Sequence, residues 1–353
     1  AAGEISSGTW NDSLIRGYEF DMTKGMVYKT VDGGDNWTQI WYGDNLARYI
    51  WINPHNTNVL YVSTGILDRE AANRDTSAGI SGGVGILKSV NGGDTWDQIN
   101  YGLTDLYVGS LFMHPDDPDI LLAVTSSPVW PDTSGVFLTA DGGTYWTRVH
   151  DHAAHSVEFS LSNPEIAYAG NASAIFRSTD GGYTWVERTD SMGIWGPPGI
   201  EAGMPLDFQV DPHDPNRIFT NNYGGGNFLS VDGGRNWTVA SKGYTGAHVR
   251  DIAVSPDDPG RVYAAARTGI FRSLDFGETW SGRNFAPARE SEWNVITIDP
   301  HNSLRVLGSG NKQGTLFVSV DGAETWEAAL GSTLGPFKNW RCATFAPARP
   351  GLI

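Results

Sequence analysis

Short runs of apolar residues, many of them alternating with polar ones, recur along the whole chain. Examples are Met26-Val-Tyr-Lys29, Gly85-Ile-Leu-Lys88 and Ala174-Ile-Phe-Arg177. Clusters of Gly, Pro, Asp, Asn and Ser separate these runs. A period of two in runs this short indicates β-strands, and the polar clusters between them are turns. The apolar spacing of helices is essentially absent, so the pattern predicts an all-β protein.

One phrase, Ser/Thr-x-Asp-x-Gly-x-x-Trp, follows seven of these runs. It occupies residues 30–37, 89–96, 139–146, 178–185, 230–237, 273–280 and 319–326. A strand, a Gly-rich turn and a second strand form a β-hairpin. We expect the third position to be structural, because its side chain can accept hydrogen bonds from N–H groups two or three residues on. The residues at this position are Asp32, Asn91, Asp141, Asp180, Asp232, Asp275 and Asp321.

Two copies depart from the phrase. Asn91 replaces the Asp, and its amide oxygen can still accept the same hydrogen bonds. Ala323 replaces the Gly, which elsewhere supplies a positive φ without a steric clash. An Ala with positive φ costs about 1 kcal/mol, so we expect that turn to be slightly reshaped.

A second, Pro-rich repeat lies between the copies of the phrase. It starts at Asn53, His114, Ser162, Asp211, Ser255, Asp299 and Ala346. Each repeating unit then reads strand A, Pro-rich turn, strand B, loop, strand C, Gly-rich turn, strand D. Repetition at this period indicates an array of supersecondary units. We therefore predict a single domain over residues 1–353, a seven-bladed β-propeller of four-stranded antiparallel blades.

The ends of the chain are predicted to share one blade. The segment Leu14–Phe20 would form strand B of the first blade, and Arg341–Ala346 would form its strand A from the C-terminal end. A ring closed in this way hides two sheet edges.

The phrase resembles the Asp-box (BNR) repeat of sialidase-like, sortilin-like and xyloglucanase-like β-propellers, and the resemblance covers nearly the whole chain. Strand B runs such as Val59–Thr64, followed by an acidic loop, resemble family-74 xyloglucanase-like hydrolases. In that family a catalytic aspartate ends such a strand, and Asp68 is the matching residue. Those enzymes place their cleft between two seven-bladed propellers, whereas this chain has the repeats of one. Sortilin-like and photosystem-assembly-factor-like propellers share the phrase and bind proteins.

Composition narrows the functional classes. The net charge of −16 and a pI near 4.8 exclude a basic nucleic-acid-binding face. The only cysteine, Cys342, excludes an internal disulfide and a Cys-based zinc site. No apolar run is long enough for a transmembrane span. His150, His152 and His155 fit no familiar metal site, so we predict neither metal nor cofactor. The resemblance implies a secreted or extracytoplasmic location, for which Ala1 would be a mature N-terminus or an artificial boundary.

The candidate site follows from the loops that break the repeat. A–B and C–D turns lie on one face of a propeller, and the long D–A and B–C loops lie on the other, where function concentrates. Carboxylates there are candidates for glycosidase catalysis, which needs two of them, and aromatic rings are candidates for sugar stacking. The candidate catalytic residues are Asp68, Glu70 and Glu201; the candidate ligand-binding residues are Trp130, Trp195, Trp293, Trp340 and Tyr244.

Two classes of function remain open. The first is an extracellular carbohydrate-active propeller, similar to a glycoside hydrolase, that binds a neutral polysaccharide on the face of the D–A and B–C loops. The second is a non-catalytic module that binds a glycan or a protein, including a second propeller, within a larger extracellular complex. The sequence leaves open whether the chain is catalytic.

Overall fold

The structure is a computed structural model of the 353-residue chain. It describes residues 2–6, 20–44, 47–65, 83–126, 131–188, 195–196, 205–222, 226–240, 249–266, 269–283, 293–310, 316–330 and 338–346.

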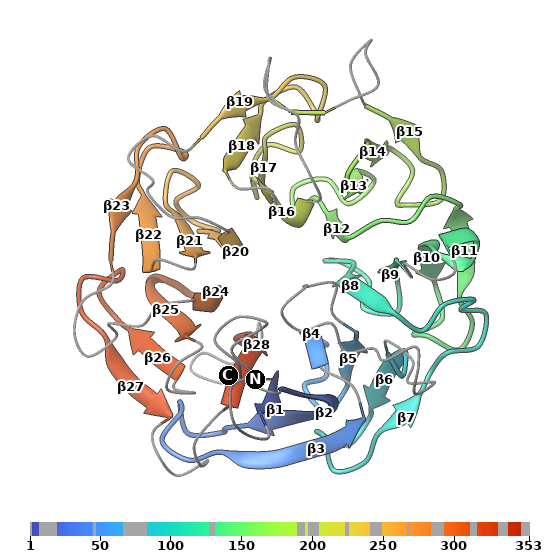
Figure 1. Ribbon diagram of the computed structural model, residues 1–353, viewed down its shortest axis with the longest axis horizontal. Coiled ribbons are helices and arrows are strands. Elements are labelled where there is room, and N and C mark those ends of the chain that lie inside the picture. The colour runs from blue at the N-terminus through green and yellow to red at the C-terminus, as the bar shows by residue number, and fades with distance from the viewer. Residues whose placement is uncertain are drawn as a thin grey trace.

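The described strands form seven four-stranded antiparallel sheets, which are arranged around a common centre (Figure 1). We number these sheets as blades. Blade 1 contains β28 (Lys338–Cys342), β1 (Ala2–Ser6), β2 (Phe20–Lys29) and β3 (Thr38–Asp44), and blade 2 contains β4 (Ala47–Ile52), β5 (Leu60–Thr64), β6 (Ile86–Ser89) and β7 (Asp97–Gln98). Blade 3 contains β8 (Val108–Met113), β9 (Leu121–Thr125), β10 (Gly135–Thr139) and β11 (Thr147–His150), with a short 3₁₀ helix at Pro131–Thr133.

Blade 4 contains β12 (Ser156–Phe159), β13 (Ala167–Gly170), β14 (Ile175–Ser178) and β15 (Val186–Glu187), and blade 5 contains β16 (Pro205–Val210), β17 (Ile218–Asn222), β18 (Asn227–Ser230) and β19 (Thr238–Val239). Blade 6 contains β20 (Val249–Val254), β21 (Val262–Ala266), β22 (Gly269–Ser273) and β23 (Ser281–Gly282), and blade 7 contains β24 (Trp293–Asp299), β25 (Asn302–Gly310), β26 (Leu316–Ser319) and β27 (Glu327–Leu330). The first strand of each blade lies nearest the centre (Figure 1).

Six blades are each continuous in sequence, and blade 1 is composite, in the order β28-β1-β2-β3. The predicted strands of this blade were wrong. Its strand B is Ala2–Ser6 rather than Leu14–Phe20, and Phe20 begins strand C. Its strand A is Lys338–Cys342, so it begins three residues earlier than predicted. The small residues of Ala2–Ser6 give a weak strand signal, whereas β1 is held by pairing with both β2 and β28.

The apolar core lies between neighbouring blades. The cluster between blades 3 and 4, for example, joins Leu122 and Val124 to Phe159 and Phe176. The middle strands are buried throughout in β5, β9, β13 and β21, whereas the two-residue outer strands β7, β15, β19 and β23 are exposed. The short, continuous apolar runs in the sequence are therefore inner strands with both faces covered.

The seven Gly-rich turns share the hydrogen bonds of the Ser/Thr hydroxyl and the bond from the N–H four residues on to the Asp or Asn side chain. In the turn of blade 4, the Ser178 hydroxyl donates to Asp180 at 2.7 Å and accepts from the N–H of Gly182 at 2.8 Å. Asp180 also accepts from the N–H and the hydroxyl of Thr184, at 2.9 and 2.6 Å. The carboxylate thus reaches an N–H four residues on, further than predicted. The Trp185 indole N–H donates to the Gly182 carbonyl at 2.9 Å and closes the turn.

Both departures from the phrase keep this pattern. The amide oxygen of Asn91 accepts from the N–H of Thr95 at 3.0 Å. Ala323 adopts a φ of 69°, and its N–H still donates to the Ser319 hydroxyl at 2.8 Å. The turn is slightly reshaped, since Gly at this position has φ values of 84–107° and the Trp326 indole donates to the Arg283 carbonyl. Phe276 also has a positive φ, and its ring lies 4.0 Å from the Arg217 guanidinium.

Polar latches connect blades 2, 4 and 6 to the blade that follows each of them. In every case a tyrosine of strand B pairs directly with a basic residue of strand C: Tyr61 with Lys88, Tyr168 with Arg177, and Tyr263 with Arg272. Lys88 donates to the Gly142 carbonyl of blade 3 at 2.7 Å, and Arg272 donates to the Gly322 carbonyl of blade 7 at 2.5 Å. Blades 3, 5 and 7 carry apolar pairs at these positions, namely Leu122 with Leu138, Phe219 with Leu229, and Leu307 with Val318.

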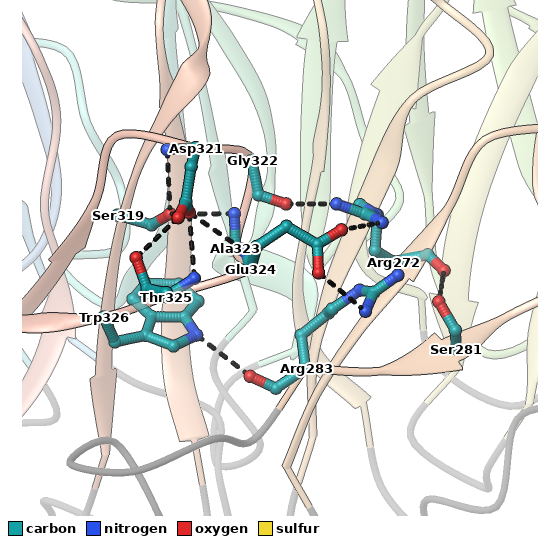
Figure 2. Close-up of polar contacts among 10 residues, drawn as sticks. All are labelled: Arg272, Ser281, Arg283, Ser319, Asp321, Gly322, Ala323, Glu324, Thr325 and Trp326. Carbon is teal, nitrogen blue, oxygen red and sulfur yellow. Dashed lines mark hydrogen bonds and ion pairs between the residues drawn. The ribbon is translucent and has the colours of Figure 1, made fainter.

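The latch between blades 6 and 7 contains more charged side chains than the other two latches. Figure 2 shows Glu324 between the guanidinium groups of Arg272 and Arg283, at 2.7 and 3.2 Å. The Trp326 indole also donates to the Arg283 carbonyl at 2.9 Å. Hydrogen bonds between charged groups are stronger than neutral ones, and Arg272 is buried, so the pair contributes to the interface between these blades.

Candidate functional site

A cavity of about 490 Å³ occupies the central channel, and the first strands of the blades line it. Its two ends differ in chemistry. At the end of the A–B turns the lining is apolar and includes five prolines and Leu161; the prolines are Pro54, Pro115, Pro212, Pro256 and Pro300. At the other end, where the D–A loops enter, the lining is polar and includes Arg48, His155, Asp207, Asp251 and Asn294. We call this second end the polar mouth.

Two carboxyl groups form the centre of the polar mouth. Asp207 of β16 and Asp251 of β20 are hydrogen-bonded to each other. Burial raises the pKa of Asp207 to about 6, although the nearby Arg48 charge opposes the shift. Burial and the Asp207 charge raise the pKa of Asp251 well above its usual range. At neutral pH, Asp251 is therefore the protonated donor and Asp207 the charged acceptor, because like charges this close do not both ionise.

Two neighbouring residues of β4 reach across the channel to blade 5. The Tyr49 hydroxyl donates to Asp207 at 3.3 Å, and Arg48 donates to the Leu206 carbonyl at 3.5 Å. Blades 2 and 5 lie three positions apart in the ring, so these bonds span the channel rather than connect neighbours. The two bonds form a strut beneath the polar mouth. Burial raises the pKa of Tyr49, which stays a hydrogen-bond donor at physiological pH.

His155 contributes a neutral imidazole to the polar mouth. It directly precedes β12, and its backbone N–H donates to the Gly170 carbonyl at 2.8 Å. Burial and the nearby Arg48 charge lower the pKa of His155 to about 4. Among the described residues, its buried Nδ1 has no hydrogen-bond partner. A buried polar atom of this kind is rare in proteins and invites a ligand or a water molecule.

A third carboxyl group lies deeper in the channel. Glu158 is 4% exposed, and its Oε1 accepts from the Val210 N–H at 2.8 Å. Gln209 lies between the layers, with its side-chain nitrogen 3.3 Å from Asp207 and 3.4 Å from Glu158. Burial, reinforced by the Asp207 charge, raises the pKa of Glu158 well above its usual range. Glu158 lies three residues beyond His155 in β12, on the inner side of the strut.

The carboxyl geometry of the polar mouth differs from that of a glycosidase. Catalytic pairs are separated by roughly 5 to 9.5 Å so that a sugar or a water fits between them. Asp207 and Asp251 instead share a hydrogen bond. The proton between them stays within the pair, and Asp251 also accepts from the N–H groups of Ile252 and Ile296 at 3.0 and 2.8 Å.

Most of the predicted site residues lie outside the described residues. These are Asp68, Glu70, Glu201, Trp130 and Tyr244. Asp68 and Glu70 belong to the segment between β5 and β6, and Glu201 to the segment between β15 and β16, so both segments are the B–C and D–A connections that were predicted.

The three other predicted ligand-binding residues are tryptophans. Trp195 is 3% exposed, and its indole donates to the Asn171 carbonyl at 3.0 Å while its ring packs on Trp237. Trp293 is fully buried against Phe317. The prediction that these two rings stack on a ligand does not fit their places in the core. Trp340 lies in β28, where only the backbone is described.

The histidines of the 150–155 segment do not converge. The rings of His150 and His152 lie against Phe176, whereas His155 faces the channel. Within the described part of the chain, no cluster of three or more His, Cys, Asp or Glu side chains could hold a metal ion. The same residues include no helix with the length and apolar character to cross a membrane.

Comparison with known proteins places the chain near glycoside hydrolases. No family model matches it. A xyloglucanase of Hypocrea jecorina is 27% identical over 202 residues, which are 57% of this chain and 23% of the relative. A xyloglucanase of a Paenibacillus species is 24% identical over 340 residues, covering 88% of this chain and 30% of the relative. The chain thus spans less than a third of the length of these relatives, and it resembles these glycoside hydrolases at low identity.

Solved structures of the same fold include enzymes and a binding protein. An ancestral GH74 enzyme superposes with a TM-score of 0.58 at 16% identity over 83% of this chain and 37% of that one. YCF48 bound to the D1 peptide superposes with a TM-score of 0.53 at 16% identity over 80% of each chain. Identities this low show the shared β-propeller fold alone.

Proposed function

We propose that the chain is a carbohydrate-binding propeller of the glycoside hydrolase type, which binds a neutral polysaccharide on the face of the D–A and B–C loops. The observation that carries this proposal is the difference between the two ends of the channel. Donors and acceptors gather at the polar mouth, on the face where the long loops begin and end, whereas the opposite end is ringed by prolines. Sites for neutral polar ligands combine such convergent hydrogen-bonding groups with a rigid scaffold.

The xyloglucanase relatives support the substrate class. Xyloglucan, a neutral polysaccharide, is therefore the first ligand to test. The relatives are also much longer than this chain, so we propose that this propeller supplies polysaccharide binding, and that hydrolysis requires Asp68, Glu70 or Glu201 together with another segment or chain. An extracytoplasmic location belongs to the same proposal, because external polysaccharides are found there.

Affinity electrophoresis tests the binding proposal. The protein is run through native gels with and without xyloglucan, and in parallel gels with polygalacturonate, which is anionic. We expect retardation by xyloglucan and little or none by polygalacturonate. An Asp180→Ala variant serves as a control, because its turn lies on the opposite face and should leave retardation unchanged. Equal mobility in every gel would refute the proposal.

Catalysis is tested separately with the same polymer. If the chain alone releases reducing ends from xyloglucan, Asp68→Asn or Glu201→Gln should abolish release and leave gel retardation intact. Loss of retardation together with release would instead place these residues in binding.

Protein binding is the second candidate. It is favoured by the superposition of YCF48, which is bound to a peptide and matches this chain over 80% of both lengths. A protein that no glycan retards and that binds peptides through the polar mouth would support this candidate over the first.

A further inference from the structure

We infer that the polar mouth is a subsite for a single neutral sugar unit. This inference rests on the proposed function, since it names the part of the polysaccharide that this face recognises. The unit is either a chain end or a branch, because the strut crosses the channel and obstructs a linear chain threaded through the ring.

The strut crosses the channel below this subsite, while the cavity continues past it to the end of the A–B turns. The bond from Tyr49 to Asp207 and the bond from Arg48 to the Leu206 carbonyl both join blade 2 to blade 5 across the channel. Tyr49 and Asp207 are further held by their own blades: the Tyr49 N–H donates to the Ser63 hydroxyl at 3.2 Å, and the Asp207 N–H donates to the Asn221 side chain at 2.8 Å. The floor of the mouth is therefore fixed on both sides.

The groups around this floor offer both donors and acceptors. Asp207 is an acceptor, and the neutral His155 has an Nδ1 that no described residue pairs. Asp251 donates its proton in the hydrogen bond to Asp207 and accepts from the N–H groups of Ile252 and Ile296. Asn294 of β24 adds an amide at the same end of the channel and is 5% exposed. A sugar hydroxyl both donates and accepts a hydrogen bond, so neighbouring hydroxyls of a pyranose can meet the Asp207 acceptor, the His155 imidazole and the Asn294 amide.

The charges at the floor itself are balanced, although the mouth as a whole carries one net positive charge. Arg48 and the ionised Asp207 compensate each other, while Asp251 and His155 are neutral at pH 7. Arg250 adds one positive charge at this end of the channel. The carboxylate of a uronic acid placed on the floor would meet the Asp207 carboxylate, which costs binding energy through like-charge repulsion.

Ligand-observed NMR titration with monosaccharides tests the subsite directly. We expect saturable binding of glucose, galactose or xylose to the wild-type protein, and at least fivefold weaker binding to His155→Ala and to Asn294→Ala. The loss of one buried hydrogen bond is worth a factor of this size. Glu158→Gln is the matched control, because that residue lies on the inner side of the strut; it should bind as the wild type does. Melting temperatures identify any variant that fails to fold. If one of the two mouth variants does not fold, the affinity of the other tests the subsite.

The titration has outcomes that overturn the inference. Tighter binding of galacturonate than of galactose would refute a neutral subsite. Unchanged xyloglucan retardation in both mouth variants, with no monosaccharide binding, would refute the subsite and leave the proposed function standing. Absence of all glycan retardation in the wild type would instead refute the proposed function. If a branched oligosaccharide binds better than its linear backbone, the occupant is a branch. If both bind equally well, and binding strengthens with the number of free chain ends, the occupant is the chain end.

Discussion

Glu158→Gln should stabilise the protein progressively as the pH rises. Glu158 is buried and keeps its proton in the folded state, because burial raises its pKa well above the usual range. In the unfolded chain the same carboxyl ionises near pH 4.3. Folding above that pH must therefore take up a proton, and this uptake destabilises the native state increasingly. Gln cannot ionise, and its carbonyl oxygen can still accept from the Val210 N–H.

The magnitude follows from proton linkage. While folded Glu158 remains protonated, the free energy of unfolding of the wild type falls by about 1.4 kcal/mol per pH unit relative to the variant. The unfolding entropy of 353 residues is about 0.7 kcal/mol/K near the melting temperature, so the melting temperatures should diverge by about 2 °C per pH unit. The other titrating groups of the channel, Asp207, Asp251 and His155, are present in both proteins. Their contributions cancel in the difference between the two free energies of unfolding.

Scanning calorimetry or urea unfolding at half-unit steps from pH 5 to pH 8 provides the measurement. Glu165→Gln is the matched control in the same blade: Glu165 is exposed in the A–B turn, so its curve should run parallel to that of the wild type. Parallel curves for Glu158→Gln and the wild type would show that Glu158 ionises freely in the folded protein, and would refute the buried, protonated state.

Three further outcomes are expected. Asp180→Ala should lower the free energy of unfolding by about 1–2 kcal/mol in urea titrations, because it leaves the Thr184 N–H without its acceptor, whereas the exposed Asp94→Ala should change it little. Arg272→Met should cost about 1–3 kcal/mol, because it leaves the Gly322 carbonyl without its donor; a melting temperature equal to that of the wild type would contradict a role for this latch. Truncation before Lys338 removes β28 and exposes an edge of blade 1, so light scattering should detect aggregation, and a monomer with unchanged melting temperature would disprove this.

The repeats made most of the fold predictable from the sequence. The Gly-rich phrase and the Pro-rich turns each mark a hairpin, and their alternation defines strands A to D of the continuous blades. The composite blade was harder, because its strand B, Ala2–Ser6, has no repeat and depends on pairing with β28, which is far away in sequence. Local sequence does not encode a partner at that distance, so the Leu14–Phe20 assignment failed.

The polar mouth escaped prediction for a different reason. The prediction that function concentrates in the long loops favoured Asp68 and Glu201. The carboxyl groups that the structure brings together lie instead within buried strands. A signal existed in the sequence: Asp207 and Asp251 interrupt the apolar strands Pro205–Val210 and Val249–Val254. A carboxyl inside a buried strand must be paired or protonated. What the sequence could not show is that strands A from distant blades place these groups around one channel.

Polar and apolar contacts alternate between neighbouring blades, and this alternation distinguishes the positions at which a circular permutant could be opened. Tyrosine–base pairs join blade 2 to 3, 4 to 5 and 6 to 7, while apolar pairs occupy the intervening seams. A period of two cannot close around seven sheets, and the mismatch falls at blade 1, whose Lys29 donates to the Gly92 carbonyl of blade 2. The polar latches thus group the blades in doublets, with the composite blade as the odd member, while apolar clusters join blades across the other seams. A circular permutant opened between doublets, at 151–155, keeps every doublet intact, whereas one opened at 99–107 divides the doublet of blades 2 and 3.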